Sequence, residues 1–269
     1  MDTARRQRYL HLLGIETWAL RGTGGVTAAP SVEEPEPPAA IREPMPRKPR
    51  PAVPPPAAAT PTAMIAAAPA AAAPREVPAD WSGLRATVKD CQACKLCATR
   101  TQTVFGVGSE TSPLMVVGEG PGADEDAQGE PFVGRAGKLL DEMLKAIGRS
   151  RKQAAPEQAV FIANVVKCRP PGNRDPEADE VEACRPYLDR QIELVKPKLI
   201  VALGRVAAQR LLATDAPLSR LRGPLHRYGP TQTPVFVTYH PAYLLRSPRE
   251  KAKSWEDLKR IHRHLAEPA

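Results

Sequence analysis

Four short apolar runs in the second half of the chain predict buried β-strands. They cover residues 114–117, 159–166, 199–203 and 234–239. Between and after these runs, apolar residues recur at the spacing of one face of a helix. The helices predicted in this way cover residues 135–147, 176–195, 205–212 and 252–265. Alternating helices and nearly continuous apolar strands are typical of an α/β fold, in which helices cover both faces of a mostly parallel sheet.

The loops after the first and last of these strands carry the candidate chemistry. The first strand ends in a turn rich in glycine, proline and carboxylates, residues 118–126, and the last continues into a His-Pro turn, residues 240–246. Glycine allows the backbone to approach a ligand closely, and turn N–H groups can bind polar ligands. Because the carboxyl ends of parallel strands meet at one edge of a sheet, the sequence predicts a single active site built from both loops.

A segment poor in apolar side chains precedes this part of the chain. Residues 27–79 contain 15 prolines and 17 alanines in 53 residues. Such a composition cannot bury enough apolar area to offset the entropy of ordering, and it predicts a disordered linker. We therefore expect a short helix at residues 1–22, a linker at residues 23–79 and a globular domain at residues 80–269. The helix is either a small cap on the domain or a docking peptide for a protein partner.

The positive charge of the chain lies mostly in the predicted domain. The formal net charge is +8, the charges of residues 27–79 cancel, and residues 1–26 contribute +2, which leaves +6 for residues 80–269. A basic domain is compatible with a polyanionic partner such as nucleic acid. No stretch is long and apolar enough to span a bilayer, and the N-terminus lacks the apolar core of a signal peptide. The sequence therefore predicts a cytoplasmic protein.

The cysteines have the spacing of metal ligands. Cys91 and Cys94 form a Cys-x2-Cys pair, and Cys168 and Cys184 follow far along the chain. In a reducing compartment such a set favours metal binding over disulfides. Four thiolates suit either a tetrahedral zinc ion or a [4Fe–4S] cluster, and their spacing does not separate the two. Cys97 adds a fifth thiol that continues the pair in the manner of a ferredoxin, and buried free thiols are the alternative without metal.

Five motifs between residue 81 and the C-terminus resemble those of the type 4 iron–sulfur uracil-DNA glycosylases, in the order of that family. They are Cys-Gln-Ala-Cys at residues 91–94, Gly-Glu-Gly-Pro-Gly at 118–122, Pro-Phe-Val-Gly at 131–134, Asn-Val-Val-Lys-Cys-Arg-Pro-Pro at 164–171 and His-Pro-Ala-Tyr-Leu-Leu-Arg at 240–246. The resemblance implies a three-layer α/β/α fold around a central, mostly parallel four-stranded sheet. It also implies the cofactor, a [4Fe–4S] cluster held by Cys91, Cys94, Cys168 and Cys184, with Cys97 as a bystander.

The activity implied by this resemblance is that of a monofunctional hydrolase in base excision repair. Such an enzyme flips uracil out of DNA, hydrolyses its N-glycosidic bond, releases free uracil and leaves an abasic site. We expect the protein to act as a monomer on uracil-containing DNA. The related branch that traps uracil covalently uses a histidine in an insert after the Asn motif. Residues 170–176 contain no histidine here, so ordinary hydrolysis is expected.

The resemblance implies that Asn164 and His240 are the main catalytic groups. The Asn164 carboxamide offers an acceptor and a donor that match N3–H and O4 of uracil, whereas cytosine presents the opposite pattern. His240 would donate a hydrogen bond to uracil O2 as negative charge develops on the departing base. Phe132 would stack on the flipped base. Without the family match, each of these three residues also has an ordinary structural interpretation as a turn, cap or core residue.

The acidic loop supplies the other candidates for uracil contact and water activation. Glu119, Gly120 and Pro121 form the part of the loop beside the base, where backbone N–H groups are available to O2. In type 1 enzymes an Asp that positions water occupies the place of Gly120, so the group that activates water here has to be another one. Glu119 and Glu125 are the candidates, and Glu125 alternatively fills the space that the methyl group of thymine would need. The neighbouring Asp126 is expected to be a solvated loop acid.

The His-Pro turn supplies the candidate DNA contacts. Leu244 and Leu245 are expected either to enter the gap left by the flipped nucleotide or to lie buried under the last helix. Arg246 suits a phosphate contact. Two other functions compete with that of a glycosylase: a non-catalytic nucleic-acid-binding iron–sulfur module, and a zinc-stabilised nucleotide hydrolase of similar fold. The intact pair of Asn164 and His240 favours the enzyme over the non-catalytic module.

Overall fold

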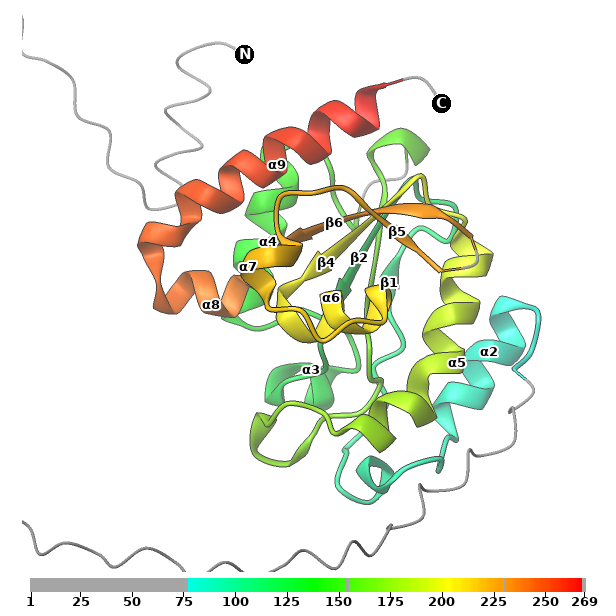
Figure 1. Ribbon diagram of the computed structural model, residues 1–269. Coiled ribbons are helices and arrows are strands. Elements are labelled where there is room, and N and C mark those ends of the chain that lie inside the picture. Colours follow the sequence, from blue (N-terminus) through cyan, green and yellow to red (C-terminus); the bar gives the residue numbers. More distant parts are fainter. Residues whose placement is uncertain (1–76, 153–154, 230, 268–269) are drawn as a thin grey trace, which may run out of the picture. The chain divides into compact units, whose positions relative to one another are not determined.

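The computed structural model describes residues 77–152, 155–229 and 231–267, and its centre is a six-stranded sheet in the order β1-β3-β2-β4-β6-β5 (Figure 1). The strands are β1 (Val107–Gly108), β2 (Leu114–Gly118), β3 (Val160–Asn164), β4 (Leu199–Leu203), β5 (His226–Tyr228) and β6 (Thr233–Thr238). The four central strands pair in parallel, and the two edge strands pair antiparallel. The mostly parallel sheet is confirmed, with six strands instead of four. The edge strands have only two and three residues, too few to produce an apolar run.

The helices connect these strands in the predicted alternation. They are α2 (Trp81–Lys89), α3 (Ala123–Gln128), α4 (Arg135–Ala146), α5 (Ala178–Val195), α6 (Gly204–Leu212), α7 (Leu218–Leu221), α8 (Pro241–Arg246) and α9 (Lys251–Ala266), with short 3-10 turns at η1 (Lys95–Ala98), η2 (Pro156–Gln158), η3 (Pro171–Asn173) and η4 (Pro248–Glu250). The four predicted strands and the four predicted helices are all present, and their ends agree with the prediction to within two residues. The helices that the sequence did not predict have at most nine residues, which gives too few turns for a clear apolar period.

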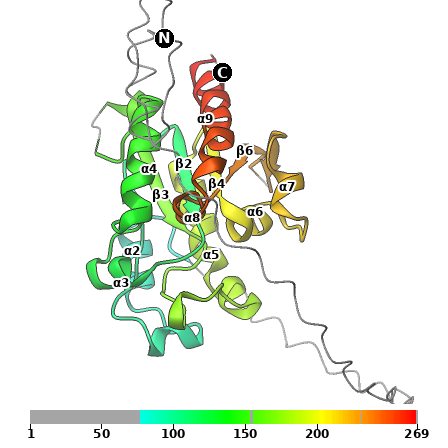
Figure 2. The ribbon, with the colours of Figure 1, turned by 90° about the vertical axis from the view of Figure 1, so that its left-hand side faces the viewer.

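The two faces of the sheet bury two separate apolar clusters. Alternate strand residues such as Leu114 and Val116 pack with α4, α8 and α9, whereas Met115 and Val117 pack with α2, α5 and α6. The two views of the ribbon show α4 and α9 on one side of the strands and α5 on the other (Figures 1 and 2). This alternation produces the three-layer α/β/α architecture, because successive side chains of a strand point to opposite faces. The predicted fold class is confirmed.

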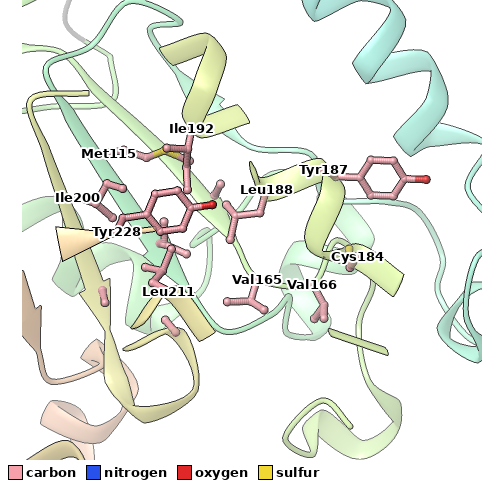
Figure 3. Packing of buried hydrophobic residues seen from close by; sticks show 14 of the residues in the cluster. Met115, Val165, Val166, Cys184, Tyr187, Leu188, Ile192, Ile200, Leu211 and Tyr228 are labelled. Carbon is pink, nitrogen blue, oxygen red and sulfur yellow. The ribbon is translucent and has the colours of Figure 1, made fainter. Parts of the chain in front are cut away.

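The cluster on the α5 side reaches from the sheet to the cysteines. Met115 and Ile200 of the sheet pack near Ile192 of α5, and Cys184 and Tyr187 lie further along the same helix (Figure 3). A continuous apolar core therefore joins the strands to the region that contains two of the predicted metal ligands.

The order of the parallel strands determines where the polar loops meet. From β2 the chain passes through α4 to β3, and from β3 it passes through α5 to β4 on the other side of β2. In open α/β sheets, ligands bind at the carboxyl ends of the strands where the order reverses in this way. The loop after β2, the end of β3 and the turn after β6 all lie at this edge of the sheet.

The predicted helix at residues 1–22 and nearly all of the predicted linker at residues 23–79 fall outside the described residues. The described part begins at Val77, shortly before α2. Within the described ranges, no helix is long and apolar enough to cross a membrane.

Candidate active site and cysteine pocket

Asn164 is the last residue of β3 and lies beside Gly118 of β2. Its side-chain oxygen Oδ1 is buried, and in the described part of the chain it is the one buried side-chain acceptor without a hydrogen-bond partner. A Cβ atom at Gly118 would lie 2.5 Å from Asn164 Oδ1 and 2.6 Å from Cζ of Phe132. Only glycine leaves room for the amide and the ring to meet at this point. The structure therefore brings Asn164 and Phe132 together, as the sequence predicted, and leaves the amide oxygen available to a ligand.

Phe132 contacts a second predicted site residue, His240. The two ring centroids are 5.5 Å apart and the ring planes are tilted by 32°. Phe132 is 7% exposed, so its ring belongs to the wall of the site and not to the outer surface. Its backbone has a φ of +57°, an unusual value for a residue other than glycine. A phenylalanine held in such a conformation requires strong contacts around it, and such strain is often found at functional sites.

His240 follows β6 and caps the N-terminus of α8. Its Nδ1 atom accepts a hydrogen bond from the backbone N–H of Ala242 at 3.2 Å. Burial and, to a smaller extent, the positive charge of Arg246 lower the pKa of His240 to about 4, against the opposing effect of the Glu125 charge. The ring is therefore neutral at neutral pH. With Nδ1 as the acceptor, Nε2 carries the proton and can serve as a hydrogen-bond donor.

Glu119 follows Gly118 at the end of β2 and pairs with a carboxylate that the sequence did not single out. Burial, together with the neighbouring Asp175, which shares a hydrogen bond with it, raises the pKa of Glu119 to about 7. Arg205 at the start of α6 opposes this shift and holds Asp175 at 2.5 Å. Near pH 7 the Glu119 carboxyl group is therefore close to half protonated, which is suitable for accepting a proton from water.

The backbone of the Glu119 loop is attached to the strand that carries Asn164. The carbonyl of Glu119 accepts a hydrogen bond from the N–H of Val166 at 3.1 Å. A Cβ atom at Gly120 would lie 2.8 Å from Cγ2 of Val166, so this approach requires glycine. Pro121 is buried at the following position. The predicted uracil-side residues Glu119, Gly120 and Pro121 are thus held next to β3.

The carboxylate of Glu125 in α3, one of the two candidates for water activation, is bound to backbone amides. Its Oε2 atom accepts the N–H of Gly122 at 3.1 Å, and Oε1 accepts the N–H groups of Val133 and Gly134 at 2.9 and 3.1 Å. Both oxygen atoms therefore hold backbone amides of the loops beside the site, which argues against water activation by Glu125. The prediction that Asp126 is solvated is wrong: it is 3% exposed and accepts the N–H of Thr101.

The prediction for the His-Pro turn requires a correction at Leu244. This side chain is 1% exposed and packs in the cluster with α9, so the alternative of burial under the last helix is the correct one. Leu245 is half-buried against the same cluster, and Arg246 is exposed. The exposed apolar surface of α8 belongs to Tyr243, which is 36% exposed and stacks on Tyr239 at 5.2 Å. The sequence gives no sign of this difference, because a helix of six residues is too short to show a period.

The five cysteines line one cavity between α2, η1 and α5. The cavity has about 280 Å³ of empty space, part of it open to solvent, and Cys97 lines it together with the four predicted ligands. Its position therefore does not distinguish Cys97 from the other four. Polar donors surround three of the sulfur atoms: Tyr187 Oη reaches Cys91 at 3.2 Å, Arg100 Nη1 reaches Cys168 at 3.1 Å and the backbone N–H of Lys167 reaches Cys184 at 3.2 Å.

This set of donors suits thiolates that carry negative charge. Burial raises the pKa of the Cys184 thiol to about 12, and the ammonium group of Lys167 opposes the shift. Arg100 likewise lowers the pKa of Cys168, which burial raises. In the described ranges, no group of three or more His, Cys, Asp or Glu side chains has the arrangement of a metal site.

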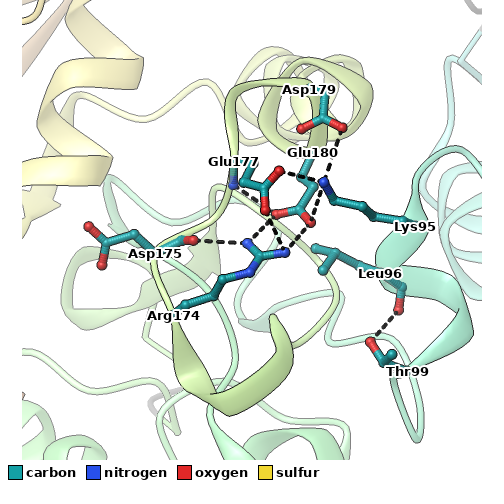
Figure 4. A network of polar contacts seen from close by, with 8 residues as sticks. All are labelled: Lys95, Leu96, Thr99, Arg174, Asp175, Glu177, Asp179 and Glu180. Carbon is teal, nitrogen blue, oxygen red and sulfur yellow. Dashed lines mark hydrogen bonds and ion pairs between the residues drawn. The ribbon is translucent and has the colours of Figure 1, made fainter.

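A polar network joins the two halves of the cysteine pocket (Figure 4). Lys95, next to Cys94, contacts Glu177 at 2.5 Å and the fully buried Glu180 at 3.8 Å, both at the start of α5. Arg174 bonds to both oxygen atoms of Glu180 at 2.8 and 2.6 Å. This network attaches the Cys91–Cys94 segment to the helix that carries Cys184. Because Asp175 follows Arg174, the same network also lies beside the Glu119 side of the candidate site.

Lys167 connects the candidate site with the cysteines, and the sequence analysis missed it. The side chain is fully buried between Asn164 and Cys168, and burial lowers its pKa to about 8. Its Nζ atom donates to the carbonyl of Asn164 at 2.8 Å and to Oε1 of Gln191 at 2.6 Å. A lysine inside an otherwise apolar strand-to-loop segment was the available signal.

Comparisons with known proteins agree with this arrangement. The model of the Uracil DNA glycosylase superfamily matches residues 105–259. A type-4 uracil-DNA glycosylase of Sulfurisphaera tokodaii is 46% identical over 190 residues, which is 68% of this chain and 83% of that protein. Proteins of the same name from Archaeoglobus fulgidus and Thermotoga maritima are 45% and 44% identical, over 65% and 60% of this chain and 87% and 80% of those proteins.

Proposed function

Because the chain belongs to the uracil DNA glycosylase superfamily, and within it to the type-4 uracil-DNA glycosylases, we propose that it removes uracil from DNA. The reaction is the hydrolysis of the bond between C1′ of the deoxyribose and N1 of uracil. It releases free uracil and leaves an abasic site for base excision repair. The enzyme is therefore a hydrolase that acts on N-glycosidic bonds.

The observation that carries this proposal is the buried, unpaired Oδ1 atom of Asn164. A buried acceptor without a donor costs about 1–3 kcal/mol, so a ligand that brings a donor is stabilised there. Uracil brings N3–H, and its O4 accepts from the amide nitrogen of the same side chain. Cytosine has no hydrogen at N3 and presents an amino group in place of O4, so it leaves the acceptor unpaired.

Stacking and a neutral imidazole complete the base-binding site. The ring of Phe132 offers a face for the flipped uracil, next to His240. As the glycosidic bond breaks, negative charge accumulates on uracil, and Nε2–H of His240 donates to O2. A neutral donor is sufficient for this task, since the low pKa of His240 keeps the ring uncharged.

Water activation belongs to Glu119 in this proposal. In its carboxylate form it accepts a proton from the attacking water, while the water oxygen bonds to C1′ and the electron pair of the broken bond remains on uracil. The burial of Glu119 and the proximity of Asp175 support this role, because together they raise the pKa of Glu119 to near the pH of the cell. Glu125 supports the site through the backbone amides of Val133 and Gly134.

The turn after β6 provides the DNA contacts in this proposal. Arg246 is exposed next to the site and suits a phosphate of the damaged strand. Leu245 and the exposed ring of Tyr243 are the apolar groups of α8 that can approach the space left by the flipped nucleotide. Their exposure near His240 supports this role, whereas Leu244 is buried.

We also propose a [4Fe–4S] cluster with Cys91, Cys94, Cys168 and Cys184 as ligands. Such a cluster would cross-link the segment before β1, the loop after Asn164 and α5. Its role would therefore be structural. The donors that reach the sulfur atoms support the proposal: the charged guanidinium of Arg100 at Cys168 and the backbone N–H of Lys167 at Cys184. For the remaining parts of the chain we propose a cytoplasmic monomer with one domain at residues 80–269, a helix at 1–22 that binds a protein partner, and a linker at 23–79.

The direct test is base release from matched oligonucleotides that carry uracil, hypoxanthine, xanthine or thymine at one position. We expect free uracil and an alkali-labile abasic strand from the uracil substrate, and no release of thymine. A protein that binds these oligonucleotides and releases no base would be a non-catalytic nucleic-acid-binding module instead.

A further inference from the structure

Arg151, in the turn after α4, is a buried cation that the reaction described above does not use. Its side chain is 4% exposed. Nη1 donates to the carbonyl of Pro131 at 2.6 Å, and Nη2 donates to the carbonyl of Phe132 at 3.2 Å. Nε is held by the carboxylate of Asp141 on α4 at 2.8 Å. Two donors of the guanidinium group therefore bind the two peptide groups on either side of Phe132, whose ring belongs to the candidate site.

The backbone of Phe132 needs such support. Its φ of +57° is disfavoured for an aromatic residue, and persists only where surrounding contacts determine it. On the far side of the Phe132 carbonyl lies the backbone of Gly137, where an added Cβ atom would come within 1.7 Å of the carbonyl oxygen. The carbonyl is thus enclosed between the first turn of α4 and the guanidinium group of Arg151.

The same loop is held from the other direction by a group of opposite charge. Oε1 of Glu125 accepts the N–H groups of Val133 and Gly134. The carbonyls of Pro131 and Phe132 therefore face a cation, and the next two amides face a carboxylate. The two charged side chains together fix the direction in which the Phe132 ring points, toward His240 and Asn164.

We propose that Arg151 is a positioning residue of the glycosylase: it binds the Pro131 and Phe132 carbonyls and so holds the Phe132 ring where it stacks on the flipped uracil. This inference rests on the proposed function, in which Phe132 contacts the base. Arg151 itself touches neither base nor DNA. Its effect on uracil binding therefore passes entirely through the Phe132 loop.

The geometry requires arginine at this position. The planar, forked guanidinium group contacts two carbonyls and the carboxylate of Asp141 at the same time, and Nη1 also reaches the carboxylate of Glu130 at 3.5 Å, whereas a lysine ammonium is a single point charge on a flexible stem. An Arg151→Lys variant keeps the buried charge but cannot bind all of these partners in one geometry. It should therefore position Phe132 less well while keeping much of the stability that the charge provides.

The test is a double-mutant cycle that is read through inhibition by free uracil. The variants are Arg151→Met, Arg151→Lys, Phe132→Ala and the double variant Arg151→Met/Phe132→Ala. The inhibition constant of uracil, kcat, KM and the melting temperature are measured for each holoenzyme. Because small displacements of positioning groups cost on the order of 10–100-fold, we expect Arg151→Met to raise the inhibition constant of uracil about tenfold, and Arg151→Lys to raise it less.

In the Phe132→Ala background, replacing Arg151 should leave the inhibition constant unchanged within about twofold, because the ring that it positions is absent. Ile261→Ala is the matched control: this residue lies in the core on α9, so its variant should lower the melting temperature without altering inhibition by uracil. If Arg151→Met does not fold, Asp141→Ala, which removes the acceptor of Nε and leaves the Arg151 side chain in place, replaces it in the cycle.

Two results would overturn the inference, and they are distinguishable. Independent, multiplicative effects of the Arg151 and Phe132 variants, or an equal effect of Ile261→Ala, would show that Arg151 only stabilises the domain, and the proposed function would stand. An unchanged inhibition constant in Phe132→Ala would show that Phe132 does not contact uracil. It would contradict both this inference and the stacking role of Phe132 in the proposed function.

Discussion

At the carboxyl edge of the sheet, Oδ1 of Asn164 is buried without a donor, whereas in the cysteine pocket the sulfur atoms of Cys91, Cys168 and Cys184 each accept a hydrogen bond. The first region also contains a desolvated neutral histidine and Glu119, whose pKa is raised by burial and by the neighbouring Asp175. The second contains Arg100 and Lys167, whose charges face the thiols. The sheet edge leaves one buried acceptor, Oδ1 of Asn164, without a partner, whereas the cysteine pocket provides donors for three of its sulfur atoms.

This difference separates recognition from stability. An unsatisfied polar group destabilises the free protein and favours a ligand that satisfies it. Thiols with hydrogen-bond donors around them suit the proposed cluster, and binding of a metal by the folded protein lowers the free energy of the folded state. Changes at the edge of the sheet should therefore alter the reaction and leave the melting temperature nearly unaffected. Changes in the cysteine pocket should do the opposite.

The largest expected effect on the reaction is that of Asn164→Ala. It removes both hydrogen bonds to the uracil edge, and losing a group that stabilises a transition state costs on the order of 100–1,000-fold in rate. Single-turnover excision from a uracil oligonucleotide measures this loss. The melting temperature should not fall, because the truncation also removes the buried, unpaired oxygen. A large drop in melting temperature would show that Asn164 belongs to the structural region.

The largest expected effect on stability is that of Cys184→Ser. It removes a proposed cluster ligand on α5, so iron content per chain and melting temperature should both fall, because binding of the metal stabilises the folded state. Cys97→Ser is the control and should keep its iron. If Cys97→Ser loses iron and Cys184→Ser retains it, the proposed ligand set is wrong.

The sequence alone predicted those features of the two regions that depend on long periodic patterns and on motifs. The four parallel strands follow from apolar runs, and their parallel direction places the loop after Gly118 and the turn at His240 at one edge. The meeting of Phe132 with His240 required the motifs as well. The spacing of the cysteines indicated a common metal site, and the structure gathers all five around one cavity.

The errors arose where a side chain has two possible directions and the pattern is too short to choose. Asp126 and Leu244 each lie in a helix of six residues. The side chains were predicted to face solvent or DNA, and both are buried. The roles of Glu125 and Arg151 could not be predicted for another reason. Both act on backbone N–H or carbonyl groups distant in sequence, and such bonds leave no pattern of side-chain types.

A smaller effect should distinguish the surface of α8 from its buried side. Tyr243→Ala removes the exposed ring that can fill the gap in a duplex, so excision from double-stranded DNA should fall roughly tenfold, given that stacking on a base contributes about 1–3 kcal/mol. Excision from single-stranded DNA should change little, since no gap forms there. Leu225→Ala is the matched control, because Leu225 is the other large apolar side chain that is well exposed in the described ranges. Equal losses on both substrates would contradict a duplex-specific role for Tyr243.

The smallest expected effect concerns pH and distinguishes the two titratable groups of the site. The Glu119 pKa is raised to about 7, so its carboxylate is lost as the pH falls below 7, whereas His240, with a pKa of about 4, stays neutral over the same range. Single-turnover excision should therefore decline on the acid side with a midpoint near 7 and not near 4.

Asp175→Asn removes the neighbouring negative charge, which lowers the pKa of Glu119. The midpoint should therefore move to lower pH, so that the variant is relatively more active at pH 6. Glu119→Gln should abolish this limb, with Asp124→Asn on the exposed face of α3 as the control. An unchanged midpoint in Asp175→Asn would mean that the carboxyl pair does not set the pH dependence, and that water activation is carried out by another group.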